Sequence, residues 1–288
     1  MRDLNFQLRA ICQRNKDGSH GTQASRWRNL DLSASQLHDL GFKGLTPRNL
    51  KPKHVSALVN LWQDQKLALS TIKNRMASLR WWAEKIGKPD IIPPNNDAFN
   101  IGRRVYVTNT SKAISLPDDA LAKVSDPLIR ISLELQRAFG LRREEALKFQ
   151  PSFAIHPDFI KLKGSWCKGG QARIVPIRND YQRDVLNRAR LLAGLGSLIP
   201  PALKYVQHLK RYEHACLVAG LHKLHGLRHA YAQQRYLELT GWPSPAAGGP
   251  KSADLSLDHK QLDHSARLLI SAELGHHRES ITAVYLGR

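Results

Sequence analysis

Cysteine is scarce in this sequence, and its few thiols are far apart. The 288 residues include only Cys12, Cys167 and Cys216, with no CxxC spacing of the kind that holds zinc. A disulfide framework is therefore excluded, which favours a reducing compartment, and we expect a cytoplasmic protein. The first stretch, MRDLNFQLRAICQRNKDGSH, has no apolar run long enough for a signal peptide or a membrane span, so we expect no membrane association.

Nucleotide-binding and metalloprotease motifs are also missing. The sequence contains neither GxxxxGKS or GxxxxGKT, nor GxGxxG, nor HExxH, so a nucleotide-driven enzyme is disfavoured. A zinc site is an alternative, because imidazoles spaced three and four residues apart can share one side of a helix. Its candidates are His222, His225, His229, His276 and His277. Two of them have another interpretation below, and we expect neither a metal nor another cofactor.

Acidic residues are few relative to basic ones. There are 24 Asp and Glu against 44 Lys and Arg, which gives a formal net charge of +20 with histidine neutral. A merely soluble basic surface is the alternative, but neutralising phosphates with release of counterions is the commonest physical use of such an excess. We therefore expect a nucleic acid partner.

The chain is long enough for about two domains, and its pattern changes where the first should end. Residues 1–88 have helical periodicity, and the clearest helix begins at an expected N-cap, Ser70, and ends before Pro89. The basic side chains off its apolar stripe are candidate DNA contacts or simply a solvated face: Lys73, Arg75 and Arg80. Residues 89–115 lose periodicity and gain Pro, Asn and Gly, which predicts a linker.

A second domain is expected over residues 116–288, mainly α-helical with one small antiparallel β-sheet. An apolar helix ends at Gly140, and two strands in the range 153–177 flank a turn that contains Lys168. Helical periodicity resumes near residue 180. It is interrupted by the Pro-, Gly- and Ser-rich residues 241–264, which predict a surface loop or insertion.

Four short segments of this second domain carry the reactive side chains in a fixed order. They are Gly140-Leu141-Arg142, the turn with Lys168, His225 to Arg228, and Leu274-Gly275-His276 followed nine residues later by Tyr285. In this order and spacing, residues 116–288 resemble the catalytic domain of the tyrosine recombinase (phage integrase) family. Residues 1–88 resemble the helical core-binding domain of that family in pattern only. The resemblance implies two domains that close around DNA as a clamp.

The resemblance implies a site-specific DNA recombinase or integrase, and the chemistry explains the residue types. Arg142 and Arg228 would hold the two non-bridging oxygens of the scissile phosphate, because guanidinium groups supply the charge that a metal ion supplies elsewhere. Tyr285 would attack phosphorus and give a 3′-phosphotyrosine. Since that bond conserves the energy of the broken phosphodiester, rejoining would need no ATP.

The same resemblance assigns the proton-transfer groups. Lys168 would protonate the departing 5′ oxygen, and His225 would assist as acid or base. His276 would either donate to the phosphate or orient the tyrosine. Glu145 would orient Arg142 from one helical turn away. Arg143 has an equal chemical claim as a phosphate contact, and only the family register favours Arg142.

Two alternatives use the same residues. A type IB topoisomerase would relax DNA with nearly the same set, although the short chain and the HxxR and LGH motifs favour the recombinase. A catalytically silent accessory DNA-binding protein is the other alternative, against which the complete set of reactive side chains argues.

The sequence departs from the family in two places. About fifty residues separate His225 from His276, roughly twice the usual number, so residues 241–264 are expected to be an insertion away from the active site or a contact to DNA or a protomer. The sequence given stops at Arg288, where relatives continue into a helix that docks on a neighbouring subunit. We therefore expect a monomer or weak oligomer without DNA, and Tyr285 on a mobile segment.

The resemblance also implies the partners. They are a double-stranded recombination site, other copies of this chain in a tetrameric synapse on DNA, and accessory DNA-bending proteins. A bacterial or mobile-element origin follows from the resemblance alone.

Overall fold

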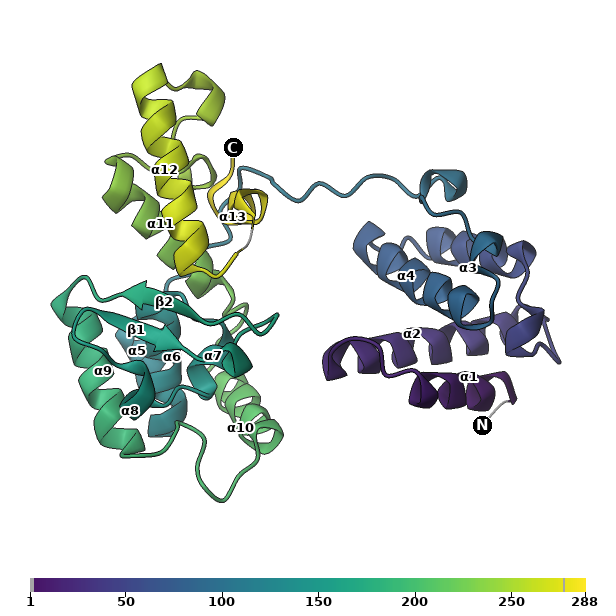
Figure 1. Ribbon diagram of the computed structural model, residues 1–288, viewed down its shortest axis with the longest axis horizontal. Coiled ribbons are helices and arrows are strands. Elements are labelled where there is room, and N and C mark those ends of the chain that lie inside the picture. Colours follow the sequence, from purple (N-terminus) through teal and green to yellow (C-terminus); the bar gives the residue numbers. More distant parts are fainter. Residues whose placement is uncertain (1–2, 277) are drawn as a thin grey trace. The chain divides into compact units, whose positions relative to one another are not determined.

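The chain forms two compact units, Met1–Val105 and Tyr106–Arg288, in the computed structural model (Figure 1). The structure describes residues 3–276 and 278–288. It is mainly α-helical with one two-stranded antiparallel sheet, so the expected fold class is confirmed. In the described part of the chain, no helix is both long and apolar enough to cross a bilayer.

The first unit is a helical bundle built around buried tryptophans. Trp62 and Trp82 are fully buried, and their ring N–H groups donate to the side-chain oxygen of Gln36 and to the carbonyl of Pro47. The indoles thus supply apolar area to the core without leaving a donor unpaired. The helices are α1 (Asp3–Arg14), α2 (His20–Asp39), α3 (Pro52–Asp64) and α4 (Leu69–Lys85), with short 3-10 turns η1 (Pro47–Asn49), η2 (Pro89–Ile91) and η3 (Asp97–Phe99).

Helix α4 buries the predicted apolar face but begins earlier than expected. Ala68 is its N-cap and Ser70 lies inside the first turn, so the expected cap at Ser70 is wrong. The apolar Leu69 is already the first residue of the helix, and no side-chain oxygen caps the N-terminus of α4. Cap chemistry is a preference that tertiary packing overrides.

The segment after α4 does not leave the first unit at once. Ile92 and Ile101 are each 2% exposed and belong to its core. Arg80 binds the intervening backbone, donating to the carbonyls of Pro93 (2.9 Å) and Asn95 (3.0 Å) and to the side chain of Asn96 (2.8 Å). Residues 89–101 of the predicted linker therefore pack on the first unit. The stretch outside the core of that unit is shorter than the predicted linker of residues 89–115.

The second unit begins with helices that lead to a sharp turn at Gly140. Helix α5 (Asp118–Ala122) precedes α6 (Pro127–Phe139), which ends at Gly140 with φ 61°. A Cβ at Gly140 would lie 2.6 Å from the ring of Tyr231, so the turn needs glycine both for its backbone and for space. Helices α7 (Arg143–Leu147) and α8 (Pro151–Ala154) follow directly.

The sheet is a single hairpin. Strand β1 (Phe159–Leu162) pairs antiparallel with β2 (Arg173–Pro176) in the register Phe159 to Pro176 and Leu162 to Arg173. The connection contains η4 (Gly164–Trp166) and the glycine turn that carries Lys168. The buried residues of the hairpin share one core with residues of α6, α9 (Asp180–Ala193) and α12 (Leu257–Glu273).

The remaining helices are α9 (Asp180–Ala193), α10 (Tyr205–Val218), α11 (Gly226–Thr240), α12 (Leu257–Glu273) and α13 (Glu279–Leu286), with η5 (Pro245–Ala247) and η6 (Ser252–Asp254) between α11 and α12. Helices α11, α12 and α13 pack on one another. This group brings HxxR, LGH and the terminal tyrosine into one place.

The predicted insertion at 241–264 is not a free loop remote from the tyrosine. Its last residues form the start of α12, and η5 packs against α13. Asp263 anchors the segment: its buried carboxylate accepts hydrogen bonds from Tyr236 (2.5 Å), Arg267 (2.7 Å) and Ser252 (3.1 Å). The expectation of a position away from the active site is therefore wrong, because these polar anchors hold the segment beside the helix that carries Tyr285.

Candidate active site

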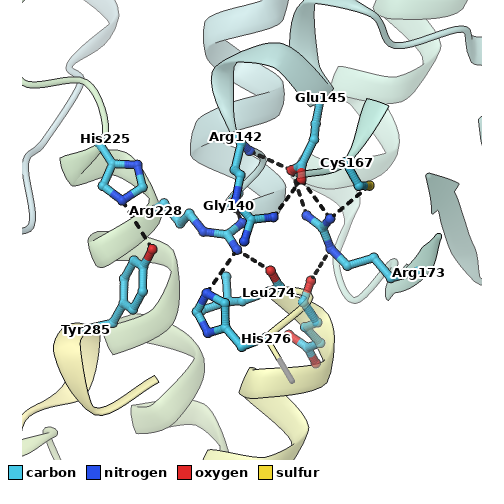
Figure 2. A network of polar contacts seen from close by, with 11 residues as sticks. Gly140, Arg142, Glu145, Cys167, Arg173, His225, Arg228, Leu274, His276 and Tyr285 are labelled. Carbon is cyan, nitrogen blue, oxygen red and sulfur yellow. Dashed lines mark hydrogen bonds and ion pairs between the residues drawn. The ribbon is translucent and has the colours of Figure 1, made fainter. Parts of the chain in front are cut away.

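Arg228 is the buried centre of the site. It lies in the first turn of α11 and is 1% exposed. Its guanidinium donates to the carbonyls of Gly140 (2.5 Å) and Leu274 and lies 3.4 Å from Nε2 of His276 (Figure 2). Burial, together with the charge of Arg142, lowers the pKa of Arg228 to about 10, which still leaves it protonated at neutral pH. One side chain thus joins the GLR turn, HxxR and LGH.

Arg142 is the N-cap of helix α7, and it is bound by the carboxylate of Glu145 in the first turn of that helix. Its backbone N–H and its guanidinium donate to the two oxygens of Glu145 at 2.7 and 2.8 Å. The Arg142 side chain is 22% exposed, whereas that of Glu145 is fully buried. Glu145 therefore fixes Arg142 as expected, and leaves part of the guanidinium open to solvent.

Glu145 has a second partner that the sequence analysis missed, Arg173 on β2. Arg173 donates to both carboxylate oxygens, at 2.8 and 2.7 Å, and also to the carbonyl of Glu273 (2.8 Å) and to Sγ of Cys167 (3.3 Å). Burial alone would raise the pKa of Glu145, but the hydrogen bonds and charge of Arg173, with Arg228 and Arg142, lower it to about 2. The carboxylate is therefore an anion that balances three arginines.

The sequence held one weak signal for Arg173. A charged residue that begins an otherwise apolar strand, ARIVPI, is either an exposed edge residue or the partner of a buried carboxylate. Only the register of the hairpin distinguishes these cases, because a one-residue slip reverses the face on which a side chain lies.

Tyr285 is held against His225. The phenol oxygen lies 3.2 Å from Nε2 of His225, and the tyrosine is 7% exposed (Figure 2). Although His225 is exposed at one side, desolvation by the surrounding protein, with the charges of Arg228 and Arg142, lowers its pKa below the usual value. At neutral pH the imidazole is therefore uncharged, and its Nε2 can accept the hydroxyl proton of Tyr285.

Two further histidines pack on the same phenol ring. His276 stacks on Tyr285 with ring centroids 5.2 Å apart, and His229, which the sequence analysis considered only as a zinc ligand, lies 4.4 Å away. Burial and the neighbouring cations lower the pKa of His276 to about 3, and burial with the nearby His225 lowers that of His229 to about 4. The tyrosine is thus enclosed by neutral imidazoles.

The segment with Tyr285 is docked on the second unit, so the expectation of a mobile segment is wrong. The carbonyl of Tyr285 accepts a hydrogen bond from Gln233 (3.0 Å), and that of Gly287 accepts one from Arg267 (2.9 Å). Leu286 is fully buried in the core. Contacts from α11, α12 and η5 hold α13 in place.

Lys168 is the one predicted catalytic residue that the structure does not bring into this network. It is exposed at the tip of the hairpin, and no hydrogen bond of its ammonium is found within the described residues. The neighbouring Lys163 is committed elsewhere: it donates to Gln150 (2.8 Å) and lies over the rings of Phe153 and Trp166. Lys168 lies in the connection between the two strands and Lys161 on β1 is also exposed, so the assignment of Lys168 as the hairpin lysine stays a prediction.

The candidate DNA contacts differ in how they are placed. Arg143 points away from Arg142 and pairs with Glu213 of α10 (2.9 Å). The guanidinium of Arg80 donates to the backbone of residues 93 and 95 and to the side chain of Asn96, so it also has a structural role, and its assignment as a DNA contact stays a prediction. Arg75 lies over the ring of Trp62, with 5.2 Å between its guanidinium carbon and the ring centroid. Lys73 is half-buried on α4.

The zinc alternative finds no support in the geometry. Within residues 3–276 and 278–288 no three His, Cys, Asp or Glu side chains are placed to hold a metal ion. His277 lies outside the described residues. His225 and His276 contact Tyr285 instead.

Solved structures with a similar fold are DNA recombinases. A lambda integrase tetramer bound to a Holliday junction has a TM-score of 0.63 at 15% identity. The alignment covers 99% of this chain and 78% of the lambda integrase chain. The XerH site-specific recombinase in a pre-cleavage complex with difH has a TM-score of 0.57 at 17% identity, with coverages of 98% and 80%. The Tn1549 transposon integrase with circular intermediate DNA has a TM-score of 0.58 at 12% identity, with coverages of 100% and 96%. At these identities the similarity shows a shared fold.

The family models match the sequence itself. The model for the N-terminal domain of phage integrases matches residues 1–92, and the integrase model matches residues 102–234. No curated protein sequence matches the chain significantly. The two models follow one another along most of the chain, over a fold shared with recombinases. The chain therefore belongs to the phage integrase family of tyrosine recombinases.

Proposed function

We propose that this protein is a site-specific DNA recombinase or integrase that cuts and rejoins DNA through a covalent bond to Tyr285, with neither metal nor nucleotide. The observation that carries the proposal is the hydrogen bond between Tyr285 and His225, adjacent to two arginines. A phenol with a neutral imidazole on its oxygen and cations beside it has what a phosphoryl transfer needs: a nucleophile, a base and charge compensation.

Arg228 and Arg142 are the proposed phosphate ligands. Nε of Arg228 is buried and has no protein partner among the described residues, and Arg142 keeps part of its guanidinium exposed. Buried donors that are already oriented stabilise a developing negative charge with little reorganisation. Glu145 and Arg173 are proposed to hold Arg142 and the hairpin in place without touching DNA.

The proposed reaction balances as follows. The Tyr285 oxygen bonds to phosphorus as its proton passes to His225, and the bond from phosphorus to the 5′ oxygen breaks. That oxygen takes a proton from Lys168 and leaves as a hydroxyl, giving a 3′-phosphotyrosine. Attack by the 5′ hydroxyl of another strand reverses each step and completes the exchange.

His276 is proposed to orient the tyrosine. A guanidinium can only donate, so Nε2 of His276 accepts from Arg228, and Nδ1 carries the proton that it donates to Thr282 at 3.0 Å. In this tautomer His276 offers no N–H toward the phosphate, which favours the orienting role over phosphate donation.

A trapping experiment tests the proposal. Duplexes that bind the protein would be selected from a randomised pool and then nicked near the cleavage point, so that the leaving strand diffuses away and the covalent adduct accumulates. Wild-type protein should give an adduct that survives SDS, with the modified peptide containing Tyr285. Tyr285→Phe should bind the same duplex and give no adduct, whereas the control Tyr205→Phe should behave as wild type.

The alternatives predict other results. An accessory DNA-binding protein would bind the selected duplex without any adduct from the wild type. A type IB topoisomerase would relax supercoiled plasmids that lack the selected site. Either result would contradict the recombinase.

Assembly and location belong to the same proposal. The similar lambda integrase structure is a tetramer on a Holliday junction, which supports a tetrameric synapse of this chain on double-stranded DNA. A cytoplasmic location is proposed from the three scattered cysteines alone. Accessory DNA-bending proteins are proposed as further partners.

A further inference from the structure

The chain that enters the second unit from the first touches the helix that carries the nucleophile. The side chain of Asn109 makes two hydrogen bonds with the backbone of Arg288: Nδ2 donates to the carbonyl at 2.7 Å, and Oδ1 accepts from the N–H at 2.8 Å. Asn109 and Arg288 are 179 residues apart in the sequence. Two hydrogen bonds therefore connect the entering segment to Arg288, just after the end of α13.

A second connection reaches Tyr285 itself. The hydroxyl of Ser111 donates to Oε1 of Gln233 (2.9 Å), and Nε2 of the same amide donates to the carbonyl of Tyr285 (3.0 Å). Gln233 is 9% exposed, so its amide has little water to replace a lost partner. Fixing Oε1 sets the rotamer that aims Nε2 at Tyr285.

The segment is also seated on the start of α11, where the catalytic histidine and arginine lie. The N–H of Ile114 donates to the carbonyl of Gly226 (3.3 Å). A Cβ at Gly226 would lie 2.6 Å from the carbonyl oxygen of Lys112, so the backbones meet at a point that admits no side chain. Residues 109–114 thus contact α11 directly, and they reach α13 through Gln233 and through Arg288, which lies just after that helix.

We infer that residues 109–114 are a positioning element for Tyr285, through Asn109 on Arg288 and through Ser111 and Gln233 on the Tyr285 carbonyl. Asn109 and Ser111 are exposed, so their hydrogen bonds can exchange with water at little cost. A pull on the entering chain can therefore break these hydrogen bonds. Their loss reduces the fraction of molecules in which Tyr285 is in place. The inference rests on the proposed role of Tyr285.

Isosteric variants separate positioning from folding. Gln233→Glu keeps the shape and an acceptor for Ser111 but cannot donate to Tyr285. Its control is Gln234→Glu on the exposed side of the same helix. Ser111→Ala removes the donor that orients Gln233, Ser111→Thr restores it, and Ser115→Ala is the control at a neighbouring exposed serine.

Two measurements are made on the full chain. Hydrogen exchange without DNA should show α13 opening about fivefold more readily in Gln233→Glu and Ser111→Ala, with Ser111→Thr and both controls like wild type. On a nicked duplex at saturating concentration, adduct formation should slow about fivefold in the same two variants while the DNA dissociation constant stays unchanged.

The outcomes are distinguishable. Wild-type protection and adduct rates in Gln233→Glu and Ser111→Ala would overturn the inference while leaving the proposed function intact. If the wild type itself forms no adduct, the proposed function fails, and hydrogen exchange still decides whether residues 109–114 hold α13.

Discussion

The phenol oxygen of Tyr285 lies 3.2 Å from Nε2 of His225, although 60 residues separate them in the chain. Arg228 lies in the first turn of α11, and its hydrogen bond to the carbonyl of Gly140 fixes the start of this helix. Helix α13 packs against α11. The proposed proton acceptor and the proposed nucleophile are therefore paired in the protein without DNA.

This pairing predicts a specific loss in His225→Ala. Removing a positioned general base slows the chemical step by about 100-fold or more without changing DNA affinity. The measurement is single-turnover adduct formation on a nicked duplex beside a binding titration. The exposed neighbour His222→Ala is the control, and a weakened affinity with an unchanged adduct rate would contradict the role of His225.

The protonation state of His225 predicts the direction of its titration. Its pKa is lowered from the usual value, so the imidazole is mainly neutral at pH 6.5 and above, and the midpoint of its titration lies below that pH. NMR of the DNA-free protein should therefore give a midpoint under 6.5 for His225. A midpoint above 6.5 would show that the charged form is favoured and would argue against a base.

The buried pair of Glu145 and Arg173 predicts a large loss of stability in Glu145→Gln. Removal of one partner leaves a buried charge without compensation, which costs about 3–5 kcal/mol. Urea unfolding at pH 7 measures it. Glu144→Gln is the matched control, because Glu144 forms a partly exposed pair with Lys148 whose loss should cost at most about 1 kcal/mol.

The enclosed histidines predict acid sensitivity. His229 and His276 have folded pKa values of about 4 and about 3, below the value of about 6.5 in an unfolded chain. Below pH 6.5 the unfolded chain takes up protons that the folded protein refuses, so stability falls as pH decreases toward those values. Each histidine contributes a slope of at most about 1.4 kcal/mol per pH unit.

Glu145 adds to the same trend at lower pH, because its pKa of about 2 is below the unfolded value and its contribution is lost between about pH 4.5 and 2. Urea unfolding of wild type and His229→Gln from pH 7.5 to 4.5 checks the histidine effect. The variant should show the shallower decline, and equal slopes would contradict it.

The basic residues of α4 predict two different phenotypes. Lys73→Ala should reduce the salt dependence of DNA binding by about 0.9 in the log–log slope if Lys73 meets a phosphate. Arg80→Ala should leave the slope unchanged and lower the unfolding midpoint of the first unit, because Arg80 holds residues 93–96. A reduced slope in Arg80→Ala would show that Arg80 is a DNA contact as well.

The order of motifs was sufficient to predict the second unit, and local patterns were not sufficient for its details. Arg142, His225, Arg228, His276 and Tyr285 carry recognisable spacing, and the structure brings them together. Arg173 and His229 escaped prediction because their partners depend on strand register and on helix packing, which are tertiary properties. The structural role of Arg80 escaped prediction because a helical pattern does not reveal which backbone folds back over it.

The hairpin has a kinetic consequence for Lys168. Leu162 and Arg173 pair at the base of the connection, and Arg173 is further fixed by Glu145, so both ends of the turn are anchored. Ten residues of chain cannot extend beyond about 3.3–3.6 Å each, which confines the ammonium to a small search volume. A group tethered in this way has a higher effective concentration at the site than the same group free in solution, so the proposed role of Lys168 needs no fixed contact to the network around Glu145.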